Sequence, residues 1–303
     1  MQKEAKNFDR TSFYEQISRN KMKSAVLMIV IVLVVIALGY VIGRAYGDPF
    51  VFLAFASIIA IIYVTIGYYS SAKIAVLGAG AKPADSQKYR QYYNLVEGLT
   101  IASGLPMPKL YIMENSQINA FASGRNPENA IMCVTTGALE NLDRSELEGV
   151  LAHELSHISN YDIRFMTLTA VLVGMISIIS QMFLRSLWFR GGGSDRDSKG
   201  SAIFMIIGII LAILAPIFVQ LVQLAISRKR EYMADASAVK FVRSPTGLIG
   251  ALKKIKKETI KPEETKRISK AVAPLFISNP FKNSDITSTH PSIDSRIQIL
   301  ERM

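Results

Sequence analysis

The chain has 303 residues, a formal net charge of +11 and a positive mean hydropathy of +0.26. Half of its residues are hydrophobic, which is high for a soluble protein and indicates segments that meet lipid. Of the 35 Lys and Arg, 16 fall in residues 228–303 and most others flank apolar runs, which is more typical of membrane topology than of nucleic-acid binding. The single cysteine, Cys133, excludes an intrachain disulfide, and we expect it to be buried and inert.

Two uncharged runs near the N-terminus predict a transmembrane hairpin over residues 24–72. Each run has the ~20 apolar residues that cross a bilayer as a helix. A cleaved signal peptide is the alternative for the first run, but the run is too long for a signal core and lacks a clear cleavage site. Residues 1–23 carry six basic side chains and the loop between the runs carries one, so the positive-inside rule places residues 1–23 and the chain after the hairpin in the cytoplasm.

Residues 73–164 read as the first half of a soluble catalytic domain. The spacing of apolar residues predicts a helix over residues 86–102, and Ser145 with Glu148 predicts a capping box at the start of a later helix. Three short segments predict strands that form a small antiparallel sheet, namely residues 109–113, 119–124 and 130–135.

A second uncharged pair, residues 165–184 and 201–227, predicts another membrane hairpin within residues 165–227. The loop between the two runs is basic, which weakens the positive-inside argument and leaves open a hairpin that does not fully cross. Residues 228–303 then form a basic second half of the catalytic domain. Their lysine-rich stretch is typical of a solvated helix face near anionic lipid.

The motif H-E-x-x-H stands at residues 153–157. Histidines four positions apart lie on one face of a helix, so His153 and His157 can present two imidazole nitrogens to one metal ion. Glu154 can reach a water bound to that metal. This is the pattern of zinc hydrolases. The alternative, a capped helix with two incidental histidines, is disfavoured because the chain has only three histidines.

A catalytic zinc needs three protein ligands and one open position. The third ligand is either His290 or a carboxylate, and the best carboxylate site is E-Y-M-A-D at 231–235, where Glu231 and Asp235 share a helix face. The second membrane hairpin makes two crossings or none, so Glu231 returns to the side of the histidines in both cases. From spacing alone, an ion pair between Glu231 and a neighbouring basic residue is an equal alternative.

Four segments together resemble the HtpX-type membrane zinc metalloproteases, relatives of the CAAX prenyl proteases among the gluzincins. They are N-A-F-A-S-G at 119–124, H-E-L-S-H at 153–157, E-Y-M-A-D at 231–235 and T-H-P-S-I-D-S-R at 289–296. The resemblance covers nearly the whole chain, with a serine in place of the second proline after His-Pro. With the elements above, it implies an α+β integral membrane protein, mostly helical, with four transmembrane or membrane-embedded helices and a zincin-like catalytic domain that carries a small antiparallel sheet.

The resemblance implies one Zn2+ per chain, bound by His153, His157 and Glu231, with Glu154 as the acid/base that activates zinc-bound water. It implies a multi-pass endopeptidase of the bacterial cytoplasmic membrane, with its active site facing the cytoplasm. The expected role is membrane-protein quality control under stress. The expected partners are membrane or misfolded protein substrates and the lipid bilayer, with no nucleic acid.

Other site residues follow from the chemistry of peptide hydrolysis and from the same resemblance. The tetrahedral intermediate carries an oxyanion, and His290 and Arg296 are candidates to stabilise it. A surface histidine in a loop is the alternative for His290. Asp235 is expected to accept a hydrogen bond from a ligand histidine.

The segment Asn119, Ala120, Phe121 and Ala122 is a candidate for binding the substrate backbone by strand addition, with ordinary packing around Phe121 as an equal alternative. Two other functions are weighed. A catalytically idle membrane scaffold is disfavoured by the intact Glu154. A peptidase specific for prenylated proteins would need a large intramembrane chamber, and so more spans than four.

Overall fold

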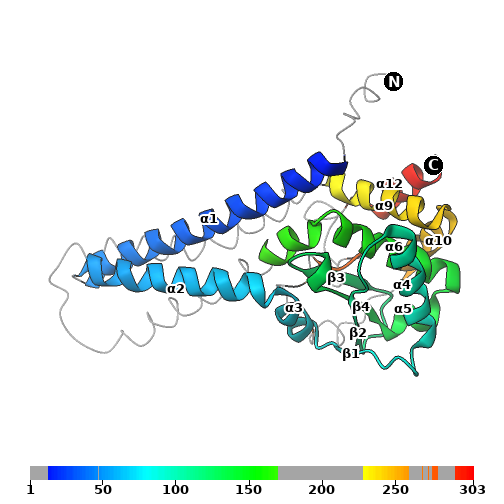
Figure 1. Ribbon diagram of the computed structural model, residues 1–303, viewed down its shortest axis with the longest axis horizontal. Helices are drawn as coiled ribbons and strands as arrows, with labels where there is room; N and C mark the ends of the chain where they lie inside the picture. The colour runs from blue at the N-terminus through cyan, green and yellow to red at the C-terminus, as the bar shows by residue number, and fades with distance from the viewer. Residues whose placement is uncertain are drawn as a thin grey trace, which may run out of the picture.

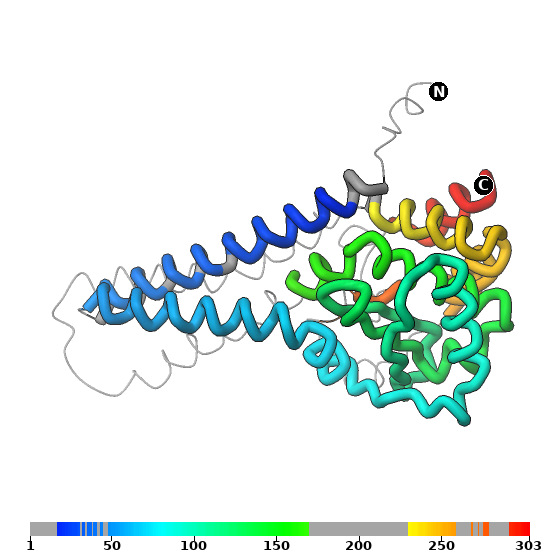
Figure 2. Tube along the Cα trace, viewed as in Figure 1, coloured from blue at the N-terminus to red at the C-terminus, as the bar shows by residue number. Residues whose placement is uncertain are grey.

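A long pair of antiparallel helices projects from a rounded part made of a small sheet and its surrounding helices (Figures 1 and 2). The computed structural model describes residues 13–46, 48–169, 228–258, 268, 272, 275–278 and 291–303. Beyond residue 169, the predicted third and fourth membrane runs therefore lie outside the described residues. The domain boundaries proposed from the sequence stay predictions.

The projecting pair consists of α1 (Phe13–Tyr46) and α2 (Pro49–Tyr69). Both contain a stretch of 21 residues that is long and apolar enough to cross a membrane, Ile17–Ala37 in α1 and the whole of α2. Such a stretch is about 30 Å long as a helix, the thickness of the bilayer's hydrocarbon core. Large apolar side chains point outward along both helices, among them Ile29, Leu33, Phe55, Ile58, Ile59 and Ile62. A surface of this kind is stable in lipid and costly in water.

Small residues allow the two helices of the hairpin to approach closely. A methyl group added at Gly39 of α1 would collide with Ala56 of α2, and Ala60 is fully buried. Close packing over small residues is how membrane helices associate, because lipid removes the hydrophobic drive between them. The start of α1 and the end of α2 both lie next to the rounded part (Figure 1).

Within the described residues the sheet has four strands in the order β1-β2-β4-β3: β1 (Lys82–Pro83), β2 (Lys109–Met113), β3 (Ala120–Gly124) and β4 (Ala130–Thr135). The expectation of an antiparallel sheet was wrong, because β2 and β4 are parallel while β3 and β4 form an antiparallel pair. The physical reason is that β4 folds back between β2 and β3 and so runs in the direction of β2. The sheet is therefore mixed, with β3 at an edge.

Both faces of the sheet are covered. Along β4, Met132 and Val134 face the main core, where α4 (Arg90–Ser103) and α6 (Arg144–Ser159) pack. Ile131 and Cys133 face the other way, toward α3 (Ser71–Ala79) and the hairpin. Every residue of β4 is buried, which explains its unbroken apolar run. Burial also raises the pKa of the Cys133 thiol.

The capping box of α6 uses other residues than the sequence suggested. The side chain of Asp143 accepts hydrogen bonds from the backbone of Ser145 and Glu146, and the Glu146 carboxylate accepts one from the backbone of Asp143 at 2.8 Å. The predicted box at Ser145 and Glu148 lies two residues too late. The helix nevertheless forms over the H-E-x-x-H motif, as expected.

Among the described C-terminal residues, three helices complete the rounded part: α9 (Arg228–Val242), α10 (Thr246–Lys257) and α12 (Ile293–Leu300). Both α9 and α10 pack on α6. The crossing of α6 and α10 is close because Gly149 lies there: a methyl group on it would stand 2.5 Å from the backbone nitrogen of Leu248. The described segments of 73–169 and 228–303 therefore pack together around one central helix, α6.

Candidate metal centre

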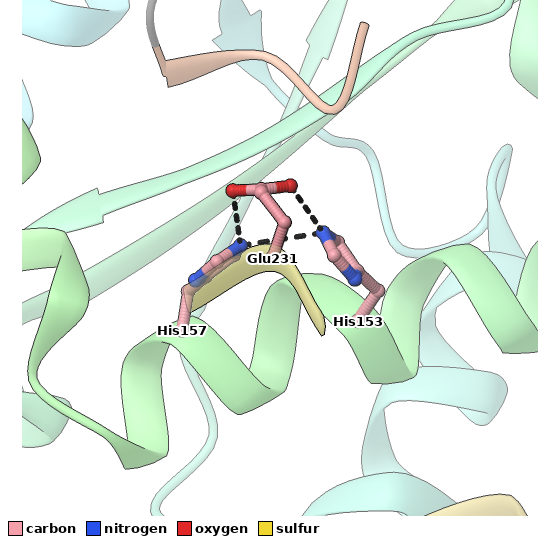
Figure 3. A group of neighbouring side chains, drawn as sticks. All are labelled: His153, His157 and Glu231. Carbon is pink, nitrogen blue, oxygen red and sulfur yellow. Dashed lines mark hydrogen bonds and ion pairs between the residues drawn. The ribbon is translucent and has the colours of Figure 1, made fainter. Parts of the chain in front are cut away.

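His153 and His157 project from the same face of α6, and Glu231 meets them from the first turn of α9 (Figure 3). The Nε2 atoms of the two histidines lie 3.3 Å apart. One carboxylate oxygen of Glu231 lies 3.6 Å from Nε2 of His153 and the other lies 3.7 Å from Nε2 of His157. One ligand atom from each residue falls within a group no more than 4.8 Å across. The structure thus brings together the three residues predicted to bind a metal.

The far side of each imidazole ring faces its own carboxylate. His153 Nδ1 lies 2.9 Å from Asp235 Oδ1, and His157 Nδ1 lies 3.2 Å from Asp162 Oδ2. A carboxylate that accepts a hydrogen bond from Nδ1–H keeps the proton on Nδ1 and leaves the lone pair of Nε2 free to bind a metal. Two imidazoles and one carboxylate, all buried, fit the donor set of a catalytic zinc site.

The charges around the group favour a cation. Burial and the charge of Arg296 both lower the pKa of His153, but the Asp235 and Glu231 carboxylates outweigh them and raise it to about 9. Burial acts to raise the pKa of Asp235, yet the charge of Arg296 and the contact with His153 hold it below its ordinary value. The Asp235 and Glu231 carboxylates therefore favour a positive charge at the buried ring of His153.

Glu154 follows the first ligand and is 1% exposed. Burial raises the pKa of its carboxyl group, against the opposing effect of the two imidazoles and of a hydrogen bond from the backbone of Ala122. A raised pKa makes a carboxylate a stronger base near neutral pH. Glu154 therefore interacts both with the two imidazoles and with the backbone of Ala122 in β3.

Arg296 comes from α12 and is 1% exposed. Its guanidinium binds both oxygens of Asp235, at 2.6 Å and 2.9 Å, and its Nη1 lies 3.7 Å from Oε2 of Glu231. Arg296 thus contacts the carboxylate that supports His153. The other residue predicted to stabilise the oxyanion, His290, lies outside the described residues, and the oxyanion role of both stays a prediction.

Residues 119–122 lead into and form the start of β3, and part of this edge is taken by the chain itself. The backbone N–H of Ile277 donates to the carbonyl of Ala120 at 2.9 Å, and Asn119 Nδ2 donates to the carbonyl of Ser278 at 2.9 Å. The rings of Phe121 and Phe276 lie 4.9 Å apart. Asn119, Ala120 and Phe121 thus help to bind the segment 275–278, and substrate binding by residues 119–122 stays a prediction.

Asp162 was not among the residues predicted from the sequence. It is the first residue of the helical segment 162–169, which follows the turn at Asn160 and Tyr161 after α6. Tyr161, just before it, has a left-handed φ of +59°, which turns the chain so that Asp162 reaches back to His157. The signal in the sequence was a carboxylate five residues after the predicted ligand His157. On a straight helix, residues five apart do not lie on the same face, so this spacing did not point to a contact.

Comparison with known proteins agrees with this geometry. A model of the peptidase family M48 matches residues 86–303. A Protease HtpX homolog from Caldanaerobacter subterraneus subsp. tengcongensis is 42% identical over 298 residues, covering 97% of this chain and 99% of the relative. Another, from Dictyoglomus thermophilum, is 40% identical over 296 residues, covering 96% and 95% of the two chains.

Among solved structures, the chain resembles the crystal structure of S. mikatae Ste24p with a TM-score of 0.51 and 19% sequence identity. The match covers 94% of this chain and 66% of that one, so this chain spans just under two thirds of the length of that protein. At this identity the likeness concerns the fold alone. The family match, the relatives and the His-His-Glu group agree, and two apolar helices accompany them. The chain therefore belongs to peptidase family M48 and is a membrane metallopeptidase of the HtpX type.

Proposed function

We propose that this chain is a zinc-dependent endopeptidase that hydrolyses peptide bonds of membrane or misfolded proteins at the cytoplasmic face of the bacterial membrane. One observation carries the proposal: three buried ligand side chains converge from α6 and α9, and Glu154 stands between them and an edge strand. Metal-dependent peptide hydrolysis requires metal ligands, a base and a strand that can bind the peptide backbone.

Zinc is the metal that best suits the donor set. Zinc sites of hydrolases use three protein ligands from histidine and carboxylate, with one position open. A zinc ion held by His153, His157 and Glu231 would polarise the scissile carbonyl and lower the pKa of water toward ~7. Asp235 and Asp162 hold the two rings in the orientation that this binding needs.

Glu154 has the role of proton carrier. Its carboxylate takes a proton from the attacking water and delivers it to the nitrogen of the leaving amine. Burial supports this role because it raises the pKa of Glu154 and so strengthens it as a base. Arg296 is the candidate donor for the oxyanion within the described residues, although Asp235 engages its guanidinium on one side.

The substrate backbone would lie along the outer edge of β3. Ala120 already uses its carbonyl for Ile277, so the part next to Ala122 is where a peptide would add. The Ala122 N–H faces Glu154, which would bring the scissile bond beside the base. Strand addition gives affinity through the main chain and little dependence on sequence, as suits an enzyme that removes misfolded proteins.

Three features support a cytoplasmic, membrane-adjacent site. Residues 1–23 carry six basic side chains, and the far end of the hairpin carries one, Arg44 in the last turn of α1. The start of α1 and the end of α2 lie at the same end of the hairpin, beside the rounded part (Figure 1). Asn20 of α1 bonds directly to Asp162, which contacts a ligand histidine. Cleavage would thus take place close to the lipid surface.

The mechanism is tested with the full-length protein purified in detergent, with zinc and an unfolded model protein as substrate. Glu154→Gln keeps the size of the side chain and removes its basicity, so we expect it to bind one zinc ion and to lose cleavage. Glu148→Gln makes the same change on the same helix, on a partly exposed side chain, and should cleave normally. Equal cleavage by Glu154→Gln and the wild type would sink the mechanism.

The metal assignment is tested by measuring bound zinc in Glu231→Ala after dialysis. The variant keeps both histidines but should lose stoichiometric zinc, while Glu148→Gln keeps it. One tightly held ion in Glu231→Ala would reject Glu231 as a ligand. A membrane-spanning substrate in proteoliposomes, compared in its folded and its destabilised form, tests the role in quality control; equal cleavage rates for the two forms would count against that role.

A further inference from the structure

A hydrogen bond connects membrane helix α1 with the metal centre. Asn20 of α1 is 3% exposed, and its side-chain nitrogen donates to Oδ1 of Asp162 at 2.8 Å and to the backbone carbonyl of Asn160 at 2.9 Å. The other oxygen of Asp162 lies 3.2 Å from Nδ1 of His157. The Asp162 carboxylate therefore joins α1 to a predicted metal ligand. Asn20 and Asp162 are 142 residues apart in the sequence.

The two ligand histidines are supported in parallel ways. His153 is oriented by Asp235, which is in turn held by Arg296. His157 is oriented by Asp162, which is held by Asn20. Outer partners of this kind fix the tautomer and the direction of a metal-binding ring, and losing one typically costs ~10–100-fold in metal affinity.

Asp162 depends on Asn20 because it is fully buried. A buried carboxylate needs hydrogen-bond donors to offset the loss of water. Arg230 Nε lies 3.6 Å from Oδ1 of Asp162, beyond hydrogen-bond length, whereas the Asn20 contact is within it. Asn20 thus provides the shorter of these two contacts to that oxygen.

The turn that precedes Asp162 contacts α1 at a second point. Lys21 Nζ lies 4.3 Å from the centre of the Tyr161 ring, and Tyr161 has the left-handed φ that directs Asp162 toward His157. The left-handed conformation costs a residue with a side chain about 1–2 kcal/mol and persists where the surroundings hold it. Helix α1 therefore supports both the side chain and the backbone that place Asp162.

We propose that Asn20 is a positioning residue for the metal centre: through Asp162 it fixes the ring of His157, so that the seating of α1 on the catalytic part sets the affinity for the metal. The inference rests on the proposed metal site. It gives α1 a role beyond anchoring, because a chain whose first membrane helix is displaced would hold its metal weakly even with all three ligands intact.

The test measures zinc affinity by chelator competition in the full-length protein, with Glu154→Gln as the background so that self-cleavage cannot interfere. Asn20→Ala should weaken zinc binding by ~10-fold or more and change the visible spectrum of the cobalt-substituted protein. Ser24→Ala is the matched control: it is one turn further along α1 and fully buried, and its hydroxyl bonds to the carbonyl of Asn20. It should leave both readouts unchanged.

A second variant separates positioning from folding. The two oxygens of Asp162 face two donors, Asn20 Nδ2 and His157 Nδ1. Asp162→Asn replaces one of these oxygens by an NH2 group, which cannot accept a hydrogen bond, so one of the two contacts is lost. The double variant Asn20→Ala with Asp162→Asn should bind zinc no more weakly than Asp162→Asn alone, because both act through the same carboxylate. If the losses of zinc affinity from the two substitutions multiplied in the double variant, the proposal would be overturned. An Asn20→Ala protein with lowered thermal stability but normal zinc affinity and cobalt spectrum would overturn it as well. If the Glu154→Gln background itself bound no stoichiometric zinc, the result would reject the proposed metal site rather than the role of Asn20.

Discussion

Arg296 binds Asp235 through two hydrogen bonds, from Nη2 to Oδ1 at 2.6 Å and from Nε to Oδ2 at 2.9 Å. Both side chains are 1% exposed. The same Oδ1 lies 2.9 Å from Nδ1 of His153. Helix α12, close to the end of the chain, therefore reaches the predicted metal ligand His153 through Asp235 and also directly, because Nη2 of Arg296 lies 3.2 Å from Nδ1 of His153.

This pair predicts a large effect of Arg296→Ala on stability. The substitution leaves the Asp235 carboxylate buried with its principal cation removed, and breaking a buried ion pair in this way costs about 3–5 kcal/mol. Thermal unfolding of the metal-free protein measures the loss, with the exposed Arg302→Ala as control. A variant that unfolds at the wild-type temperature but has lost kcat would contradict the supporting role and favour direct contact with the oxyanion.

The crossing of α6 and α10 predicts that Gly149→Ala is destabilising. Its new methyl group would meet the backbone of Leu248, which cannot move aside as a side chain can, and overpacking of this kind costs about 1–3 kcal/mol. Gly98→Ala makes the same change at an exposed position of α4, where nothing lies within 4 Å, and should stabilise the protein by about 0.5–1 kcal/mol. Opposite shifts of the unfolding temperature are expected; equal shifts would show that the crossing tolerates a methyl group.

The ring contact between Phe121 and Phe276 predicts coupling between edge strand β3 and the segment 275–278. Each alanine substitution should destabilise the protein by about 3–5 kcal/mol because both rings are buried. The double variant should be about 0.5–1.5 kcal/mol more stable than the sum of the single losses predicts, since the pair contact is counted twice. Strict additivity would mean that the segment packs against β3 without a specific ring interaction.

The close approach at Gly39 predicts that Gly39→Ile separates the membrane hairpin. The larger side chain cannot fit against Ala56, and a loss of about 1–3 kcal/mol is expected. Ala37→Ile on the same helix adds the same kind of bulk at an exposed position and should be neutral in lipid. Unfolding in bicelles compares the two variants. Similar stabilities would indicate that the helices are held by their ends alone.

Local patterns in the sequence predicted the elements that bear the chemistry. The bounds of β2 and β4 agree with the predicted strands, and H-E-x-x-H lies on a helix as its spacing requires. The meeting of Glu231 with the two histidines was also expected, because a hairpin returns the chain to its starting side. These features depend on side-chain period and chain direction, which a sequence displays directly.

What the sequence could not give depends on contacts between distant segments. Strand periodicity says nothing about partners, so the insertion of β4 beside β2 and the parallel pairing it creates were not foreseen. Asp143 with Glu146 and Ser145 with Glu148 both have the spacing of a capping box, and the structure uses the earlier pair to begin α6. Asn20 lies in the basic segment 1–23, and no local pattern indicates its bond to Asp162, because that bond joins two segments 142 residues apart.

The burial of Cys133 makes the orientation of the membrane hairpin directly measurable. It is the one cysteine of the chain, lies 1% exposed within β4, and has a pKa that burial raises, so it does not form the reactive thiolate readily. A cysteine introduced before α1, or in the loop between α1 and α2, would therefore be the one reactive thiol of the folded protein. Labelling it from one side of sealed vesicles with a membrane-impermeant maleimide would report which end of the hairpin faces the cytoplasm, with no other residue needing to be changed.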